Sequence, residues 1–165
     1  VNIPLFRMRR DVATDLEDEP PVETWLWLRQ RHGGHTIVAV NVGGAVVPGA
    51  FAAHLWLSGR LGVAALLCVA FVAAVSRALS RVEPGVGVTM PVFIAPLSAA
   101  FIALAIDPAH AAPLAYIGGT FGVLIGADLL RLNQTARFGA PVASIGGAGT
   151  FDGIFLTGVV AVLLT

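Results

Sequence analysis

Long apolar segments with almost no charge dominate this chain and limit what it can fold into. The 165 residues are 56% hydrophobic and only 12% charged, with a mean hydropathy of +0.83, whereas a soluble domain carries about 25% charged residues. A helix needs about 20 mostly apolar residues to cross a bilayer. Five segments approach or exceed that length, at about Thr36–Leu57, Leu61–Leu79, Met90–Ile106, Ala112–Leu130 and Val142–Thr165.

These segments predict an all-α polytopic membrane protein with about five transmembrane helices, some of them broken by glycine. Residues 36–165 form the predicted membrane domain, with membrane lipid as its surroundings. Residues 1–35 form a predicted cytoplasmic tail that holds many of the charges. In this tail Trp25 and Trp27 suit the headgroup region of a bilayer, and they predict a short interfacial helix before the first span.

The arginines predict how the chain is oriented in the membrane. Nine of the ten fall on one side of the predicted spans, and only Arg60 falls on the other. Because cytoplasmic loops carry an excess of basic residues, the N-terminus is predicted to be cytoplasmic and the C-terminus outside. The nine are Arg7, Arg9, Arg10, Arg29, Arg31, Arg77, Arg81, Arg131 and Arg137.

Glycine and proline interrupt the apolar segments. Gly146, Gly147 and Gly149 lie within four residues, and each weakens a helix by about 1 kcal/mol relative to alanine. Unwound backbone is tolerated at membrane depth only where it is buried in protein or lines a wet cavity, so this stretch is predicted to bind a substrate or an ion. The three interrupted stretches are Asn41–Gly49, Pro84–Ser98 and Ser144–Gly153.

Other glycines indicate close helix packing or a weak internal sequence repeat. Gly118 and Gly119, and Gly122 and Gly126, are typical of small residues that let two membrane helices approach. The stretch Gly43–Phe51 also resembles Gly146–Phe155 with one residue inserted. Chance similarity of glycine- and alanine-rich sequence is one explanation of this resemblance, and a weak internal repeat is the other.

Two aspartates, Asp128 and Asp152, are the candidate chemical groups. Charged residues within spanning segments are rare and usually functional, and both lie in the cytoplasmic half of neighbouring predicted helices. Two adjacent carboxyl groups can share a proton and act as general acid and general base. A structural alternative pairs Asp128 with Arg131, three residues further on, and lets Asp152 cap unwound amides near Gly149.

The remaining polar residues carry weaker signals. Asn41 lies in the same cytoplasmic half and is a candidate hydrogen-bond partner for the aspartates or for another helix. Near the outer face, His54, Asp107 and His110 form either a metal site or a set of scattered interfacial residues. Because the formal net charge is zero and Cys68 is the one cysteine, we predict no nucleic-acid partner, no metal site built on thiolates and no cofactor.

Several motifs resemble a known family. Four motifs resemble a prokaryotic membrane family called domain of unknown function 1614. They are Val1–Leu5, Asn41–Ala45, Gly126–Leu130 and above all Ser144–Gly158. The resemblance covers nearly the whole chain and implies an integral protein of a prokaryotic cytoplasmic membrane. A more distant likeness is to diaspartyl intramembrane proteases of the presenilin and signal-peptide-peptidase type, which carry one aspartate in a Gly-x-Gly-Asp motif and another on a neighbouring helix.

Three hypotheses for function follow. The first is an intramembrane aspartyl-type peptidase that cleaves transmembrane segments, with Asp128 and Asp152 as the catalytic pair and with Gly146, Gly147, Gly149 and Asn41 binding the substrate. The second is a small channel or transporter in which the two aspartates bind a cation or proton. The third is a non-catalytic subunit of a membrane complex; a homo-oligomer is also expected if five spans are too few for transport.

Overall fold

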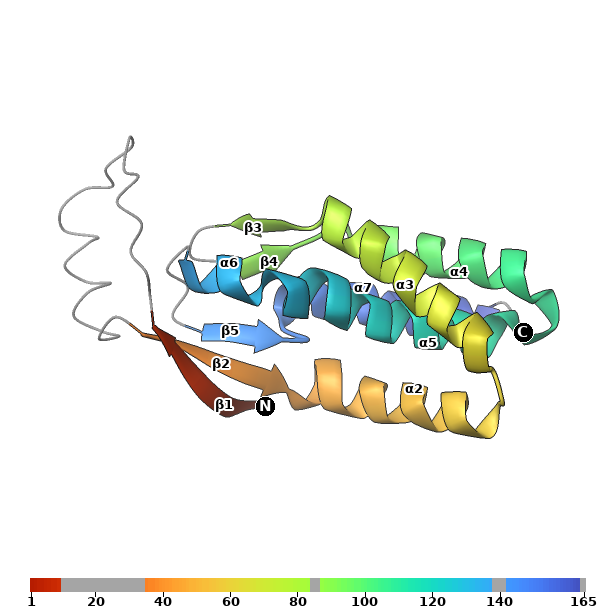
Figure 1. Ribbon diagram of the computed structural model, residues 1–165, viewed down its shortest axis with the longest axis horizontal. Helices are drawn as coiled ribbons and strands as arrows, with labels where there is room; N and C mark the ends of the chain where they lie inside the picture. Colours follow the sequence, from red (N-terminus) through yellow and green to blue (C-terminus); the bar gives the residue numbers. More distant parts are fainter. Residues whose placement is uncertain (10–34, 84–86, 138–141, 164–165) are drawn as a thin grey trace.

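The chain folds into a helical bundle with small β-sheets at one end (Figure 1). The structure is a computed structural model, and it describes residues 1–9, 35–83, 87–137 and 142–163. The predicted interfacial helix lies outside these residues, so it stays a prediction, as does the domain boundary at residue 35. Within the described residues the chain is mostly helical, which agrees with the predicted class.

Five helical segments build the bundle in the described part of the chain. Gly62–Leu79, and Pro108–Thr135 within the fourth segment, are long and apolar enough to cross a membrane, whereas Ile94–Ile106 spans only about 20 Å at 1.5 Å per residue. The segments are a π-helical turn η1 (Val42–Val46) with α2 (Val47–Ser58); α3 (Gly62–Leu79); α4 (Ile94–Ile106); the run η2 (Pro108–His110), α5 (Ala111–Val123), η3 (Leu124–Asp128), η4 (Leu129–Arg131) and α6 (Leu132–Arg137); and α7 (Ala148–Leu163).

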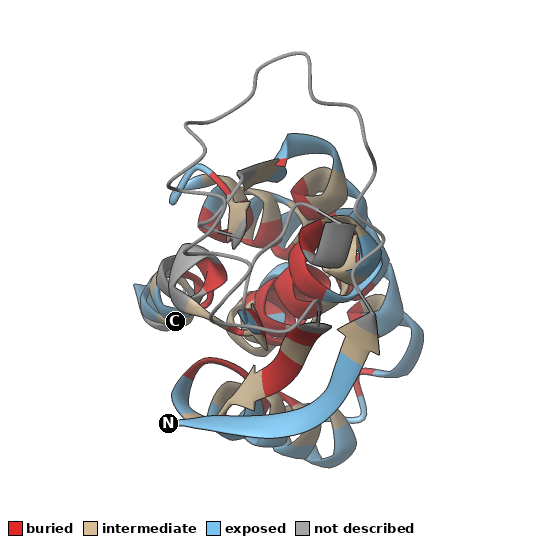
Figure 2. Ribbon diagram, turned by 90° about the vertical axis from the view of Figure 1, so that its left-hand side faces the viewer, coloured by how far each residue is buried: buried red, intermediate tan, exposed pale blue. Residues whose placement is uncertain are grey.

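Helix α5 is the centre of the bundle. It packs against α2, α3, α4 and α7, and Leu114, Ile117 and Val123 are fully buried. The neighbouring helices instead expose large apolar side chains, among them Phe71 on α3 and Phe101 on α4. Figure 2 shows this distribution, with buried residues in the middle of the bundle and exposed ones around it. An apolar surface around an apolar core is what a lipid-facing bundle presents.

Two sheets correct the prediction that the chain is all α. Strand β1 (Asn2–Arg9) pairs antiparallel with β2 (His35–Asn41), β2 pairs parallel with β5 (Val142–Ile145), and β3 (Arg81–Glu83) pairs antiparallel with β4 (Gly87–Thr89).

The first and fifth predicted spans were therefore wrong at their starts, where the chain forms strands β2 and β5. Hydropathy cannot separate a buried strand from a helix, and the β-branched Ile37, Val38 and Val40 favour a strand once β1 and β5 flank them.

The two similar glycine-rich stretches, which begin at Gly43 and Gly146, contact one another in the fold. Strand β2 leads through Gly43 and Gly44 into η1 and α2, and the parallel strand β5 leads through Gly146 and Gly147 into α7. Gly146 has φ +68°, a left-handed conformation that glycine adopts without strain. A Cβ on Gly146 would lie 2.6 Å from the backbone carbon of Gly44. Two strand–glycine–helix units therefore pack backbone to backbone at the same level of the molecule.

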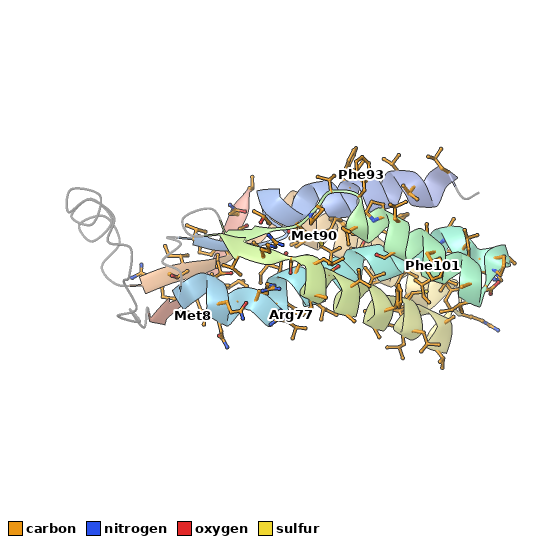
Figure 3. All side chains as sticks on the ribbon, turned by 90° about the horizontal axis from the view of Figure 1, so that it is seen from above. Met8, Arg77, Met90, Phe93 and Phe101 are labelled. Carbon is orange, nitrogen blue, oxygen red and sulfur yellow. The ribbon has the colours of Figure 1, made fainter. Side chains whose placement is uncertain are left out.

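The ends of the bundle differ in charge. Arg77, Arg81 and Arg131 lie at the end that carries the sheets, and Figure 3 shows Arg77 there. Arg60 follows α2 at the opposite end, where Asp107 and His110 connect α4 to α5 (Figure 1). The sheets therefore share one end of the bundle with these three arginines.

Glycines let α5 approach α3 closely; the small-residue pattern predicted close packing of this segment but not which helix it packs against. A Cβ on Gly122 would lie 2.6 Å from Val72 Cβ, and one on Gly118 would lie 2.8 Å from Cys68 Cβ. On another side of α5, a Cβ on Gly119 would overlap the Thr157 side chain of α7. The central helix can therefore contact both neighbours closely only because these positions lack a side chain.

We expect Gly122→Ala to lower the free energy of unfolding by about 1–3 kcal/mol, because the added methyl group overpacks the contact between α5 and α3. Gly49→Ala is the matched control, since its Cβ would lie 3.8 Å from the Phe121 ring, an ordinary contact. Thermal unfolding in detergent, followed by circular dichroism, measures both. Equal melting temperatures for Gly122→Ala and the unsubstituted chain would contradict this packing.

Candidate functional site

Asp128 is buried where the central helix meets the start of α7. Its side chain is 5% exposed and lies in the π-helical turn η3, an irregularity that is frequent at functional sites. The backbone N–H of Gly146 donates to Asp128 Oδ2 at 2.6 Å, and the Thr150 hydroxyl donates to the same oxygen at 3.1 Å. Asp128 therefore joins the fourth helical segment to the turn that opens the last helix.

The local sequence of this turn explains why the carboxyl group binds there. Gly147 N–H donates to the Ser144 carbonyl and Thr150 N–H to the Gly147 carbonyl, both at 3.1 Å, so the chain turns tightly between β5 and α7. The first N–H groups of a helix have no partner within that helix. Asp128 provides an acceptor just before this helix, and Thr150, which is 2% exposed, adds a second donor.

Arg131 does not pair with Asp128, so the predicted pairing of these two residues was wrong. The guanidinium donates instead to the Arg77 carbonyl at 2.6 Å and to the Ser80 hydroxyl at 2.7 Å, at the C-terminal end of α3. Basic side chains suit helix C-termini, where carbonyl groups lack partners. Among the described residues, the one ion pair joins Asp107 to His110, and Asp128 has only uncharged donors.

The predicted pairing of Asp128 with Asp152 stays a prediction. Residue 152 lies in α7, but its side chain is outside the described part of the chain, as is Gly149. Thr150, which contacts Asp128, belongs to the same helix.

Asn41 caps the other strand–glycine–helix unit. Its Oδ1 accepts from Gly44 N–H at 2.8 Å, and its Nδ2 donates to Asn2 Oδ1 at 2.9 Å. The Ser144 hydroxyl also donates to Asn2 Oδ1, at 3.0 Å, so Asn2 links β2 to β5. Asn41 thus bonds to the start of the helical segment that follows it and to Asn2. At the start of α7, the acceptor for the backbone N–H is Asp128 instead.

The three predicted outer-face residues do not form a metal site within the described residues. Asp107 Oδ2 lies 2.8 Å from His110 Nδ1, and this hydrogen bond lowers the pKa of the exposed Asp107 carboxyl below its usual value. His54 joins no group of three metal-ligating side chains in the part of the chain described. Asp107 also accepts from Ala109 N–H at 3.1 Å, so this carboxylate begins the η2 turn.

One comparison with known proteins identifies the family of this chain. The family model described as "Protein of unknown function (DUF1614)" matches residues 1–164. The chain belongs to this family. No significant match was found among curated proteins or among solved structures. The predicted family is therefore confirmed, and the function of this DUF1614 member has to be argued from its site.

Sequence reasoning missed two participants in this site, the Thr150 hydroxyl and the Asn2 side chain. It named Gly146 as a binding residue but did not foresee that its N–H donates to Asp128. Asn2 and Thr150 both lie within motifs that identified the family, Val1–Leu5 and Ser144–Gly158, which was the available signal. The sequence shows the glycine but does not show to which acceptor its backbone N–H donates.

We expect Asp128→Ala to increase hydrogen exchange at the Gly146 amide about tenfold or more, because the amide loses its acceptor in a buried setting. Hydrogen–deuterium exchange with mass spectrometry measures this in detergent. Asp107→Ala is the control, since it removes an acid at the opposite end of the bundle and should leave the Gly146 amide unchanged. Equal protection of Gly146 in both variants would contradict the bond to Asp128.

Proposed function

We propose that this chain is an integral membrane protein with its sheets and N-terminus in the cytoplasm and its C-terminus outside. Two helices of spanning length and the exposed apolar side chains of the outer helices support this. The grouping of Arg77, Arg81 and Arg131 at the sheet end, opposite Arg60, supports the orientation. The shorter helices then lie within the bilayer beside the two long ones, with lipid as their neighbour.

Cysteine labelling tests this topology. On a Cys68→Ala background, Arg60→Cys should react with a membrane-impermeant maleimide added outside intact cells, and Arg81→Cys should react only after the cells are opened. Both positions are exposed, so labelling reports which side of the membrane each occupies. Labelling of Arg81→Cys from outside would contradict the proposed orientation.

We propose that Asp128 is the ion-binding residue of a small cation- or proton-coupled channel or transporter. A buried carboxylate without a charged partner is costly, and acids of this kind within membrane segments mark ion and proton pathways. Asp128 has uncharged donors on one oxygen and lies where two helical segments are interrupted. Discontinuous helices near the membrane midplane are typical binding sites of transporters.

The arrangement also suggests how binding would be coupled to movement. Gly146 N–H and the Thr150 hydroxyl hold the start of α7 onto Asp128. A change in the charge of Asp128 alters both bonds, because a neutral carboxyl group is a weaker acceptor than a carboxylate. Binding and release at Asp128 would then shift the glycine-rich turn between two arrangements.

We expect Asp128→Asn to abolish cation- or proton-dependent flux into liposomes that contain the purified protein. Asn keeps the shape of the side chain but removes the charge that balances a bound cation. Asp107→Asn is the matched control, because Asp107 is an exposed acid at the other end of the bundle. Flux at the unsubstituted rate in Asp128→Asn, or no flux in the unsubstituted protein, would contradict the proposal.

An aspartyl-type intramembrane peptidase is the second candidate. One observation favours it: Asp128 contacts Gly146 and Thr150, in the same segment that carries Asp152. Catalysis would require Asp152 and Asp128 to lie close enough to share a proton. Liposomes without flux, but with cleavage of a transmembrane peptide that is lost in both Asp128→Asn and Asp152→Asn, would favour this candidate.

A further inference from the structure

We propose that Arg77, Arg81 and Arg131 form a binding site for the phosphate of an anionic phospholipid on the cytoplasmic side of the bilayer. The three come together where α3 ends. Arg77 lies in the last turn of α3, Arg81 follows in β3, and Arg131 reaches the same point from η4 (Figure 3 labels Arg77). The inference rests on the proposed topology, which places this end of the bundle at the level of the lipid headgroups.

Uncharged partners hold the Arg131 guanidinium in place. Its Nε donates to the Ser80 hydroxyl at 2.7 Å. One terminal nitrogen donates to the Arg77 carbonyl at 2.6 Å, and the other donates to Gln134 Oε1 at 2.9 Å. None of these acceptors carries a negative charge, whereas the guanidinium is always charged. Because Arg131 is half-buried, an anion beside it would lower the cost of burying that charge.

No acid among the described side chains supplies that negative charge. The one ion pair in the described part of the chain joins Asp107 to His110 at the other end of the bundle, and Asp128 accepts its hydrogen bonds from the start of α7. The Arg77 side chain takes part in none of the described hydrogen bonds, and its charge is close enough to interact with that of Arg131. Two guanidinium groups so placed repel each other, and a phosphate that accepts from both removes the repulsion.

Exposed leucines beside these arginines favour a lipid over a free anion. Leu79 is the last residue of α3, and Leu129 and Leu130 belong to the η4 turn that carries Arg131. The three leucines are 46%, 46% and 58% exposed. A free phosphate gains nothing from apolar side chains, whereas a phospholipid presents a phosphate and acyl chains next to each other. Basic side chains at the cytoplasmic ends of membrane helices are known to bind such headgroups.

Native mass spectrometry of the purified chain, released from detergent that contains a defined lipid, tests the site by counting bound lipids. The probes are anionic phosphatidylglycerol and zwitterionic phosphatidylethanolamine with the same acyl chains. We expect phosphatidylglycerol to bind about fivefold more tightly, which is the contribution of about one basic side chain at an anionic surface. Arg77→Gln should lose this preference. It should still fold, because only the backbone carbonyl of Arg77 takes part in the bonds that hold Arg131.

Arg7→Gln is the matched control. It removes the same charge from the same end of the bundle, but from the exposed strand β1, which lies on the other side of that end from β3 (Figure 1). Its lipid preference should equal that of the unsubstituted chain. No preference for phosphatidylglycerol in the unsubstituted chain, an equal loss in both variants, or displacement of the lipid by an excess of inorganic phosphate would overturn the lipid site. The labelling of Arg60→Cys and Arg81→Cys decides the topology separately, so the two failures can be told apart.

Discussion

The hydrogen bond from Gly146 N–H to the buried Asp128 carboxyl is the contact on which the arrangement of this molecule depends. It joins two segments eighteen positions apart in sequence, the irregular end of the central helix and the turn before α7. A buried polar group without a partner costs about 1–3 kcal/mol, so neither group can leave the other without a replacement. The same contact that fixes the fold thereby fixes the position of the one buried acid of the described chain.

Glycine makes this contact possible. The left-handed Gly146 turns its N–H toward Asp128, and its missing side chain lets the turn touch Gly44. Two parallel strands therefore end side by side, and each passes through glycines into a helix. One helix start is capped by Asn41 from within its own unit, and the other by Asp128 from a different segment. Of two similar units, therefore, only the second depends on an acid from another part of the described chain.

Much of this could be predicted from sequence. The apolar runs indicated the helices, and the boundaries of α3 agree with prediction to within one residue because its whole length is apolar. The small residues indicated that the fourth apolar segment packs closely against another helix, and the motifs indicated the family. The strands could not be predicted, because β2 and β5 are apolar too and depend on partners distant in sequence. The partner of Arg131 could not be predicted either. Pairing rules for side chains three residues apart on one helix do not reveal that the end of α3 lies within reach of the Arg131 guanidinium.

The central claim is that Asp128 exchanges a proton or a cation in the folded protein. Infrared difference spectroscopy of the protein in lipid tests it most directly, because the carbonyl stretch of a protonated carboxyl group is distinct from the bands of a carboxylate. We predict that a change of pH converts one form into the other, with a difference band that is missing in Asp128→Asn. A spectrum in which no band assigned to Asp128 responds to pH would contradict this account.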